Sequence, residues 1–452
     1  MRVSKYILLL VAIVLASCQF RQDEWVDFMN IPEAQNLPFR VYGQHETDLS
    51  QGLPQNCYLP DGIRVADYNE TIEDIDYDND SIDENGARRA RKTSSTTAAA
   101  ILQELLKYNK QKKVVEIVGT YRTVDTNRDS ITVSGKVLLP KGRKPKRLIL
   151  LSHYTVCSNA EAPSNCFPLE GVLVPMGYGL IVPDYIGYGV TANQVHPYLV
   201  MGLTARNVLD MYLAVKPWLK AIDMEPEEPE IMLMGYSQGG ANTMAVQYLI
   251  ETAYSSDEDP DQVKIHRVFA GGGVYDVKAT YERFVNTDTA SYPVAVPLVV
   301  QGMILGNNLQ IEIEDLVRPR IYKHLDEWVN SKKYTTAQIN QLIGTKVTHK
   351  ILSPEAMDQT SWKVSELQKA MVANSITSFS WTPEASVYML HSMDDETVPF
   401  INASNAKTKW RDANITYNFG HYGPHVMGCL RFISSVQKLL REEEKEVKKY
   451  EE

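Results

Sequence analysis

The stretch from Ile231 to Ala241 reads IMLMGYSQGGA and carries the clearest structural signal in the chain. Its apolar start is typical of a short strand buried on both faces, and small and apolar residues continue beyond it at helical spacing. Between them lies a Gly-x-Ser-x-Gly turn centred on Ser237. A serine hydroxyl is a weak nucleophile, so it must be exposed on a sharp turn, and the glycines let strand and helix pass closely. The stretch therefore predicts a nucleophilic serine at position 237.

Length and composition are those of a globular protein. The chain has 452 residues, of which 44% are hydrophobic and 23% are charged. This length suffices for two to three domains or for one decorated α/β domain. The formal net charge of −10 argues against a nucleic-acid partner, because no basic face is available to neutralise phosphates. The acidic run from Glu70 to Glu84 lacks EF-hand spacing, so we expect a solvated loop there.

The N-terminus has the pattern of a targeting segment. Arg2 and Lys5 supply positive charge, and Ile7 to Leu15 form an apolar stretch too short to span a membrane. The following LASC tetrapeptide, which ends at Cys18, resembles the bacterial lipobox. That resemblance implies cleavage before Cys18 and lipidation of its thiol, with a plain secretory signal as the alternative. We therefore expect an exported, membrane-anchored lipoprotein that faces the periplasm or the cell surface.

Export would place the other cysteines where thiols can pair. These are Cys57, Cys157, Cys166 and Cys429. We expect a disulfide between Cys157 and Cys166, which would close a polar loop just after a predicted strand. No cysteines or histidines lie at zinc-ligand intervals, so neither a metal nor another cofactor is expected.

Strand-like and helix-like segments alternate through the middle of the chain. Val114 to Thr123 and Ile131 to Leu139 flank a polar turn and predict a hairpin. A helical period covers Met201 to Ile222. Besides the strand before Ser237, continuous apolar runs typical of buried parallel strands lie at Arg147 to Ser152, Leu180 to Val182 and Val268 to Ala270. This pattern predicts an α/β fold with a mostly parallel, doubly wound sheet and a ligand site at the carboxyl ends of its strands.

The alternation stops near Lys278, and mostly helical sequence follows. The mostly helical sequence includes Ile313 to Ser331 and a segment through Leu342 that Thr335 or Thr336 would cap. An insertion at this place would lie above the strand ends as a cap that builds the substrate pocket, with Val294 to Leu305 as its most apolar part.

Six segments follow from these patterns. The N-terminal extension is expected to be irregular apart from one helix capped by Ser94 to Thr97. The expected boundaries are 1–17 for the signal peptide, 18–110 for the tether and extension, 111–277 and 381–442 for the two parts of the core, 278–380 for the helical cap and 443–452 for a charged tail.

An acidic residue and a histidine complete the expected site. Asp395 follows a predicted strand and has the right spacing to a Val-Pro turn, with Asp394 as the alternative. His425 lies between the last predicted strand and the last helix, where an imidazole can accept the proton of the serine. His421, in the same loop, is the alternative base. Ser237, Asp395 and His425 follow the chain order of an α/β-hydrolase triad.

Two backbone N–H groups are predicted to bind the oxyanion. Gln238 begins the helix after Ser237, and Thr155 follows the first buried parallel strand, with Tyr154 as the alternative to Thr155. The neighbouring His153 is expected to be structural, because the base is already supplied from another segment.

The region from about Tyr121 to Leu440 resembles the α/β-hydrolase superfamily, specifically its secretory, fungal lipase A-like group of lipases and esterases. The resemblance rests on PDYIGYG at 183–189, HPY at 196–198 and the triple glycine that precedes Tyr275 and Asp276. It implies an α/β-hydrolase fold with a helical cap and ester hydrolysis through an acyl-enzyme. Asp184 and Tyr185 are expected to be structural or to form the pocket wall. The chain departs from the group at His153-Tyr154, where His-Gly is usual.

The sequence thus predicts a serine hydrolase acting on carboxylic esters of lipids, small molecules or glycans. The main alternative is an esterase that removes acetyl or feruloyl groups from polysaccharides, which an exported lipoprotein could meet at the cell surface. A serine peptidase would share the triad, and a non-catalytic lipoprotein that binds glycan or lipid is the alternative outside enzymes.

Overall fold

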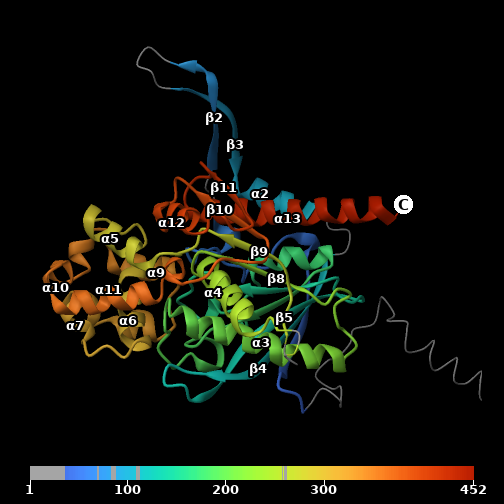
Figure 1. Cartoon of the computed structure of the whole chain (residues 1–452), viewed down its shortest axis with the longest axis horizontal. Helices are drawn as coiled ribbons and strands as arrows, with labels where there is room; N and C mark the ends of the chain where they lie inside the picture. Colours follow the sequence, from blue (N-terminus) through green and yellow to red (C-terminus); the bar gives the residue numbers. More distant parts are fainter. Residues whose placement is uncertain are drawn as a thin grey trace, which may run out of the picture.

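A central sheet covered by helices makes up the body of the protein (Figure 1). The computed structural model describes residues 36–68, 71–82, 88–107, 112–256, 258 and 262–451. The expected signal peptide at 1–17 and the expected lipidation site Cys18 lie outside these described residues. Within them, no helix is long and apolar enough to cross a membrane.

The sheet has nine strands in the order β1-β4-β5-β7-β6-β8-β9-β10-β11. The pairs β1–β4, β4–β5 and β5–β7 are antiparallel, and all pairs from β7 to β11 are parallel. The strand bounds are β1 Arg40–Asp48, β4 Lys113–Val124, β5 Ser130–Pro140, β6 Leu148–Ser152, β7 Gly179–Pro183, β8 Ile231–Tyr236, β9 Ile265–Gly271, β10 Val387–Ser392 and β11 Ile415–Gly420. Every residue of β6, β7, β8 and β10 is buried, as the continuous apolar runs predicted. The mostly parallel α/β fold is therefore confirmed.

Helices cover both faces of this sheet. In β8, Leu233 packs in the same apolar cluster as helices α3 (Met201–Ala221) and α4 (Gln238–Ala253). Its neighbours Met232 and Met234 pack in a second cluster with α2 (Ala98–Lys107) and α13 (His425–Glu451). Because successive strand residues point to opposite faces, the two clusters mark the two sides of the sheet. Figure 1 shows α13 and α2 side by side, with α3 and α4 across the sheet from them.

The cap lies between β9 and β10 and extends from one end of the sheet (Figure 1). Its helices are α5 Val277–Thr287, α6 Ala295–Gly306, α7 Ile313–Leu316, α8 Pro319–Tyr322, a π-helical turn at Asp326–Asn330, α9 Thr336–Ile343, α10 Pro354–Met357 and α11 Trp362–Ala373. Thr335 caps α9 as predicted. Ile313 to Ser331 is mostly helical as expected, but it is divided into short pieces, because Val317 and Arg318 are extended and Pro319 starts a new helix.

The N-terminal extension is more regular than expected. β1 adds an antiparallel edge strand to β4, and β2 (Thr71–Ile82) pairs with β3 (Arg88–Thr97) in a hairpin that stands out from the body (Figure 1). The acidic run expected as a loop is therefore mostly strand. The predicted helix forms as α2, and Gln437 of α13 donates to the carbonyl of Leu105 across 2.8 Å.

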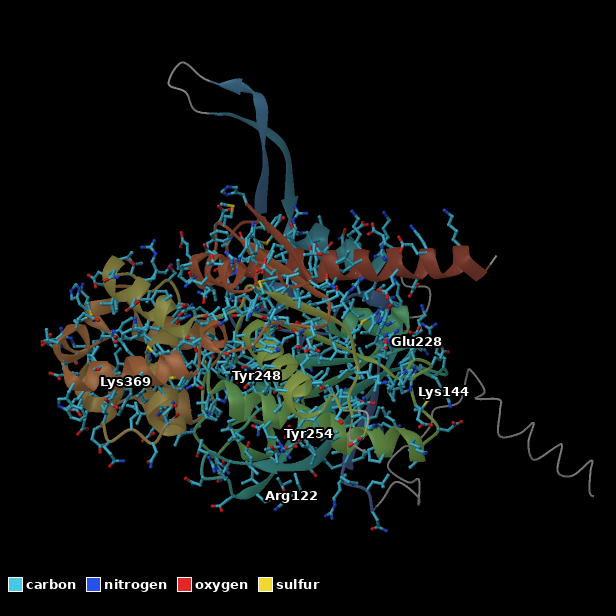
Figure 2. All side chains as sticks on the ribbon, in the orientation of Figure 1. Arg122, Lys144, Glu228, Tyr248, Tyr254 and Lys369 are labelled. Atoms are coloured by element: carbon cyan, nitrogen blue, oxygen red, sulfur yellow. The ribbon has the colours of Figure 1, made fainter. Side chains whose placement is uncertain are left out.

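The C-terminal charged segment is helical, since α13 continues to Glu451. Figure 2 labels three cationic residues, Arg122, Lys144 and Lys369, and they lie on well-separated parts of the molecule.

Candidate active site

Ser237 lies on a strained turn between β8 and α4. Its φ of 59° and ψ of −125° are unfavourable for a residue with a side chain, and its N–H donates to the carbonyl of Gly271 across 2.9 Å. A Cβ at Gly239 would lie 2.0 Å from the carbonyl oxygen of Ser152, and one at Gly235 would lie 2.3 Å from the carbonyl oxygen of Gly239. Both glycines are therefore required for the strand and helix to approach closely, as the sequence pattern indicated.

The structure brings Ser237, His425 and Asp395 together from three segments of the chain. His425 Nε2 lies 2.8 Å from Ser237 Oγ, and His425 Nδ1 lies 2.6 Å from Asp395 Oδ2. Asp395 Oδ1 accepts the backbone N–H groups of Thr397 and Val398 across 3.0 and 2.8 Å. A carboxylate only accepts, so Nδ1 carries the hydrogen and Nε2 accepts from the serine hydroxyl. All three side chains are buried.

The alternative pair, His421 and Asp394, bonds to itself instead. His421 Nδ1 lies 2.7 Å from Asp394 Oδ1, and both side chains are exposed, by 47% and 41%. The hydroxyl of Ser237 is bonded to His425 and not to His421. The pair therefore joins two surface loops, the one after β10 that carries Asp394 and the one after β11 that carries His421.

His425 is anchored by the residue that precedes the serine. The phenolic O–H of Tyr236 donates to the carbonyl of His425 across 2.7 Å, and the two ring centres are 4.9 Å apart. Burial holds the pKa of Tyr236 well above its ordinary value, so the phenol stays a donor. Ser392 Oγ donates to the carbonyl of Gly423 across 2.6 Å, which ties the His425 loop to the end of β10.

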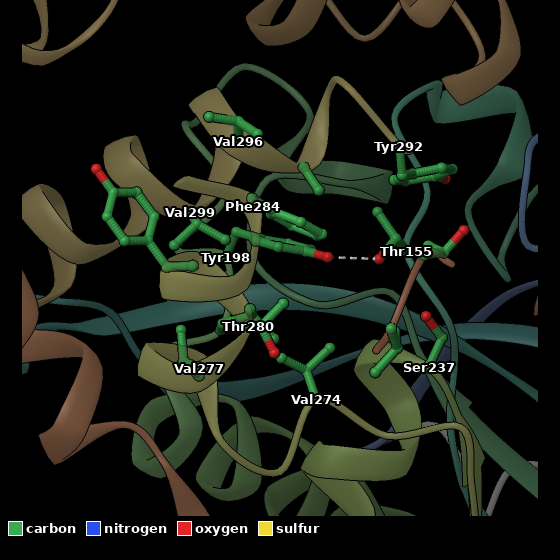
Figure 3. Close-up of a pocket in the computed structure, with 15 residues that line it drawn as sticks. Thr155, Tyr198, Ser237, Val274, Val277, Thr280, Phe284, Tyr292, Val296 and Val299 are labelled. Carbon is green, nitrogen blue, oxygen red and sulfur yellow. Dashed lines mark hydrogen bonds between the residues drawn. The ribbon is translucent and has the colours of Figure 1, made fainter. Parts of the chain in front are cut away.

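The two predicted oxyanion donors come from different segments, the start of α4 and the loop after β6. Gln238 is the first residue of α4, so its backbone N–H belongs to a helix N-terminus. Thr155 lines the same pocket as Ser237, and its hydroxyl is 2.8 Å from that of Tyr198 (Figure 3). The phenol of Tyr154 donates to the carbonyl of Tyr58. The roles of the Gln238 and Thr155 backbones stay predictions.

The Gln238 side chain is held by a neutral histidine. Its Nε2 lies 3.0 Å from His196 Nε2, and His196 Nδ1 lies 2.7 Å from the carbonyl of Ile186. Burial, followed by the charge of Lys332, lowers the pKa of His196 to about 3. The ring is therefore neutral, with its hydrogen on Nδ1 facing the carbonyl, and its Nε2 accepts from the Gln238 amide. This bond fixes the start of α4 next to the serine.

The residues expected to be structural make structural contacts. His153 stacks on Tyr185 with ring centres 3.9 Å apart, and burial lowers its pKa to about 4. Asp184 accepts the hydroxyl of Ser134 across 2.6 Å and the N–H of Ser164 across 2.7 Å. These contacts tie the ends of β5, β6 and β7 together.

A mainly apolar pocket opens beside Ser237 (Figure 3). It has about 500 Å³ of empty space, counted together with the solvent at its mouth, and is built largely by the cap. From α6, Val296 and Val299 reach it, while most of the remaining apolar residues of that helix pack in the core. Its full lining is Thr155, Tyr198, Leu199, Ser237, Val274, Val277, Thr280, Tyr281, Phe284, Tyr292, Ala295, Val296, Val299, Thr397 and Val398.

The model of the secretory lipase family matches residues 169–429, more than half of the chain. The chain belongs to the secretory lipase family. It is therefore an ester hydrolase of the lipase and esterase class. No curated protein matches the sequence.

Several solved structures share the fold of this chain. The rice cell wall degrading esterase LipA from Xanthomonas oryzae matches with a TM-score of 0.65 and 20% identity, over 76% of this chain and 95% of LipA. A Legionella pneumophila protein matches with a TM-score of 0.63 and 16% identity, over 76% and 94% of the two chains. Candida antarctica lipase A matches with a TM-score of 0.51 and 19% identity, over 71% and 75%. These likenesses show that the chain has an α/β-hydrolase fold.

A second cavity, which we call the His425 groove, opens on the imidazole side of the candidate site. It has about 1180 Å³ of empty space and is more open than the apolar pocket. Sequence reasoning missed this groove, because its walls come from segments with no common motif. Its lining is Asp61, Ile63, Tyr68, Ser291, Tyr292, Pro293, Ala337, Asn340, Gln341, Gly344, Thr345, Lys346, Thr397, Pro424, His425 and Val426.

The expected disulfide is not formed. Cys157 and Cys166 are both buried free thiols. A 3-10 turn with a capping box between Ser158 and Glu161 follows Cys157, and the Cys166 thiol donates to the carbonyl of Glu161 across 3.1 Å. The loop is thus closed by backbone and carboxylate hydrogen bonds in place of the bridge. Among the described residues, no group of three or more histidine, cysteine, aspartate or glutamate side chains could hold a metal ion.

Proposed function

We propose that this secretory lipase is an exported, lipid-anchored serine hydrolase that cleaves carboxylic esters through an acyl-enzyme. Ser237 is the nucleophile, His425 the general base and Asp395 the carboxylate that orients it. The observation that carries this proposal is the continuous chain of hydrogen bonds from Ser237 Oγ through the imidazole to a buried carboxylate. Lipidation of Cys18 rests on the sequence alone.

The first half-reaction acylates the enzyme. As Ser237 Oγ bonds to the ester carbonyl carbon, its proton passes to His425 Nε2, and the resulting imidazolium is stabilised by Asp395. The carbonyl oxygen becomes an oxyanion, for which the backbone N–H groups of Gln238 and Thr155 are the proposed donors. The C–O bond to the alcohol then breaks, and Nε2 returns its proton to the leaving oxygen.

The second half-reaction is hydrolysis. Water gives a proton to His425 Nε2 and bonds to the acyl carbon, and the acyl group leaves Ser237 Oγ as that oxygen recovers a proton. We assign the acyl chain to the apolar pocket, since its lining adjoins Ser237 and is mainly aliphatic and aromatic.

Hydrolysis of p-nitrophenyl esters by Ser237→Ala tests the proposal. We expect kcat/KM to fall about 10⁴-fold or more, because the other site residues act only through the serine. A melting curve close to that of the wild type would show that the variant is folded. Activity within tenfold of the wild type would refute the assignment. Incorporation of labelled fatty acid by the exported full-length protein, and its loss in Cys18→Ser, tests the anchor separately.

A further inference from the structure

The two proposed oxyanion donors, Gln238 and Thr155, belong to segments that are far apart in the chain. Gln238 starts α4, and Thr155 lies in the loop after β6. A donor stabilises an oxyanion best at about 2.7–3.1 Å, so the separation between the two N–H groups matters as much as the position of each. The inference below rests on the proposed function, because the oxyanion forms only when Ser237 attacks an ester.

A third segment contacts both donor residues. It is 196–198, the HPY segment, which lies between β7 and α3. Its histidine, His196, has Nε2 at 3.0 Å from Gln238 Nε2, and its tyrosine, Tyr198, has its hydroxyl at 2.8 Å from that of Thr155 (Figure 3). The two rings pack edge to face with their centres 5.8 Å apart. Because all four side chains are buried, they form one continuous set of contacts from one donor residue to the other.

The HPY segment is itself held tightly by the core. His196 Nδ1 lies 2.7 Å from the carbonyl of Ile186, and a Cβ at Gly187 would lie 2.8 Å from His196 Cα. The residue after the segment, Leu199, has a φ of 59°, which is unfavourable for a residue with a side chain. Such a conformation persists only where the surroundings determine it. The HPY segment is therefore a rigid support.

Helix α6 of the cap packs against the other side of this support. A Cβ at Gly302 would lie 2.3 Å from the carbonyl oxygen of Tyr198, and one at Gly306 would lie 2.2 Å from Val200 Cγ2. The two glycines are four residues apart, so they lie on one face of the helix. Only glycine allows the helix backbone to approach the HPY segment this closely.

We infer that His196 and Tyr198 are positioning residues that, together with α6, hold the Gln238 and Thr155 N–H groups at the separation the oxyanion requires. The cap then has two roles. It forms much of the wall of the apolar pocket, and through Gly302 it supports the oxyanion donors. Since the oxyanion exists only in the transition state and the tetrahedral intermediate, loss of this support should lower kcat and leave KM almost unchanged.

Two ketones with the same alkyl chain separate positioning from general damage. With octyl trifluoromethyl ketone, Ser237 Oγ bonds to the carbonyl carbon, the serine proton passes to His425 and the ketone oxygen becomes an anion. Octyl methyl ketone fills the same pocket, but its carbonyl is too weakly electrophilic to form this adduct. A variant with displaced oxyanion donors should therefore bind the fluorinated ketone more weakly and the methyl ketone equally well.

His196→Phe keeps a buried ring and removes both nitrogens. We expect its kcat on p-nitrophenyl octanoate to fall about 10- to 100-fold, with KM within about threefold of the wild type. The inhibition constant of the fluorinated ketone should rise by the same factor as kcat falls. His196→Gln places an amide oxygen near the position of Nε2, so it should recover about tenfold of the lost kcat.

Tyr198→Phe removes only the hydroxyl that is bonded to Thr155. Its kcat should fall about tenfold, again with weaker binding of the fluorinated ketone alone. Tyr121→Phe is the matched control, because Tyr121 is also buried and its hydroxyl donates to the carbonyl of Asn207 across 3.0 Å, outside the pocket lining. Both ketones should bind Tyr121→Phe as they bind the wild type.

Gly302→Ala tests the contribution of the cap without changing the HPY segment or the pocket lining. The added methyl must displace α6 or the segment, so kcat should fall about 3- to 10-fold with the same difference between the ketones. Gly202→Ala is its control, because Gly202 lies in α3 close to the segment and an added Cβ there meets nothing within 4 Å. Its kcat should equal that of the wild type.

Unchanged kcat in folded Tyr198→Phe and His196→Phe, or equal weakening of both ketones, would overturn the inference. If His196→Phe does not fold, Tyr198→Phe and Gly302→Ala decide the question with the same two ketones. Failure of the fluorinated ketone to inhibit the folded wild-type enzyme, or to form an adduct on Ser237, would instead count against the proposed function.

Discussion

Two histidine–aspartate pairs lie on the same loops at the carboxyl end of the sheet, and only one reaches the serine. His425–Asp395 and His421–Asp394 have nearly equal nitrogen to oxygen distances, 2.6 and 2.7 Å. The first pair is buried and continues to Ser237, whereas the second is about half exposed. The two hydrogen bonds are thus nearly equal in length, and the pairs differ in burial and in contact with Ser237. A general base needs both burial and contact with the serine, because water screens an exposed pair and only contact allows proton transfer.

The largest expected effect is the difference in kcat/KM between substitution of His425 and substitution of His421. His425→Ala should lower kcat/KM on p-nitrophenyl octanoate by about 10⁴-fold or more, because Ser237 loses its proton acceptor. His421→Ala should stay within about twofold of the wild type, since its pair is exposed. Steady-state kinetics on the four proteins, including the double variant, measure this. Equal losses in the two single variants would remove the distinction between the pairs.

Substitutions of Asp395 and Asp394 should differ almost as much in their effect on kcat. Asp395→Asn should lower kcat by about 10³- to 10⁴-fold, because an amide can hold the imidazole in the wrong tautomer. Asp394→Asn is the control one position away, and it should change kcat by less than about twofold and the free energy of unfolding by less than about 1 kcal/mol. A larger loss from Asp394→Asn than from Asp395→Asn would reverse our assignment.

A buried lysine without a hydrogen-bond partner gives a third comparison between a buried and an exposed position. Lys332 is buried, its ammonium has no hydrogen-bond partner among the described residues, and burial lowers its pKa to about 8. Between that value and about 10.4, the ordinary lysine pKa, the unfolded chain binds more protons, so this group makes stability rise with pH. Lys332→Met should remove that rise and increase the free energy of unfolding at pH 7 by about 3 kcal/mol.

Urea unfolding at pH 7 and at pH 9.5 measures the effect as a difference between variant and wild type. Lys333→Met, at the exposed neighbouring position, should change the free energy of unfolding by less than about 0.5 kcal/mol at both pH values. A destabilised Lys332→Met protein would mean that the ammonium stabilises the cap through its contact with the ring of Tyr188 at 5.0 Å.

The smallest expected effect concerns the anchor of the buried pair. Tyr236→Phe removes the hydrogen bond to the His425 carbonyl but keeps the ring contact at 4.9 Å. We expect a loss of about 1 kcal/mol in the free energy of unfolding and a several-fold lower kcat. Tyr422→Phe, which removes a bond to Asn418 beside the exposed pair, should leave kcat unchanged. Identical kcat values in Tyr236→Phe and the wild type would show that α13 alone positions His425.

The sequence was informative wherever short segments determine their own structure. The buried strands are continuous apolar runs, the turn at Ser237 needs its two glycines, and Thr335 caps α9 through its own hydroxyl. The choice between His425 and His421 was harder, because the two histidines lie close together in the sequence after β11. The hydrogen bonds from Tyr236 to the carbonyl of His425 and from Ser392 to the carbonyl of Gly423 join segments that are distant in the sequence, so the sequence alone does not show them.

Features that depend on distant backbone pairing could not be predicted. β1 has a mixed polar sequence, and only its pairing with β4, such as Arg40 opposite Thr120, makes it a strand. The His425 groove likewise needs Asp61 from the N-terminal segment to lie close to Asn340 in the cap. The expected disulfide was wrong for the same reason, since sequence spacing alone does not show where two side chains point.

Covalent labelling of the native protein by a fluorophosphonate tests the central claim most directly. Peptide mass spectrometry should find one adduct, on Ser237, formed in the wild type and in His421→Ala, slowed by about 10³-fold or more in His425→Ala. It should be absent from Ser237→Ala. A folded wild-type protein that takes no label, or that takes it on another serine, would contradict the account.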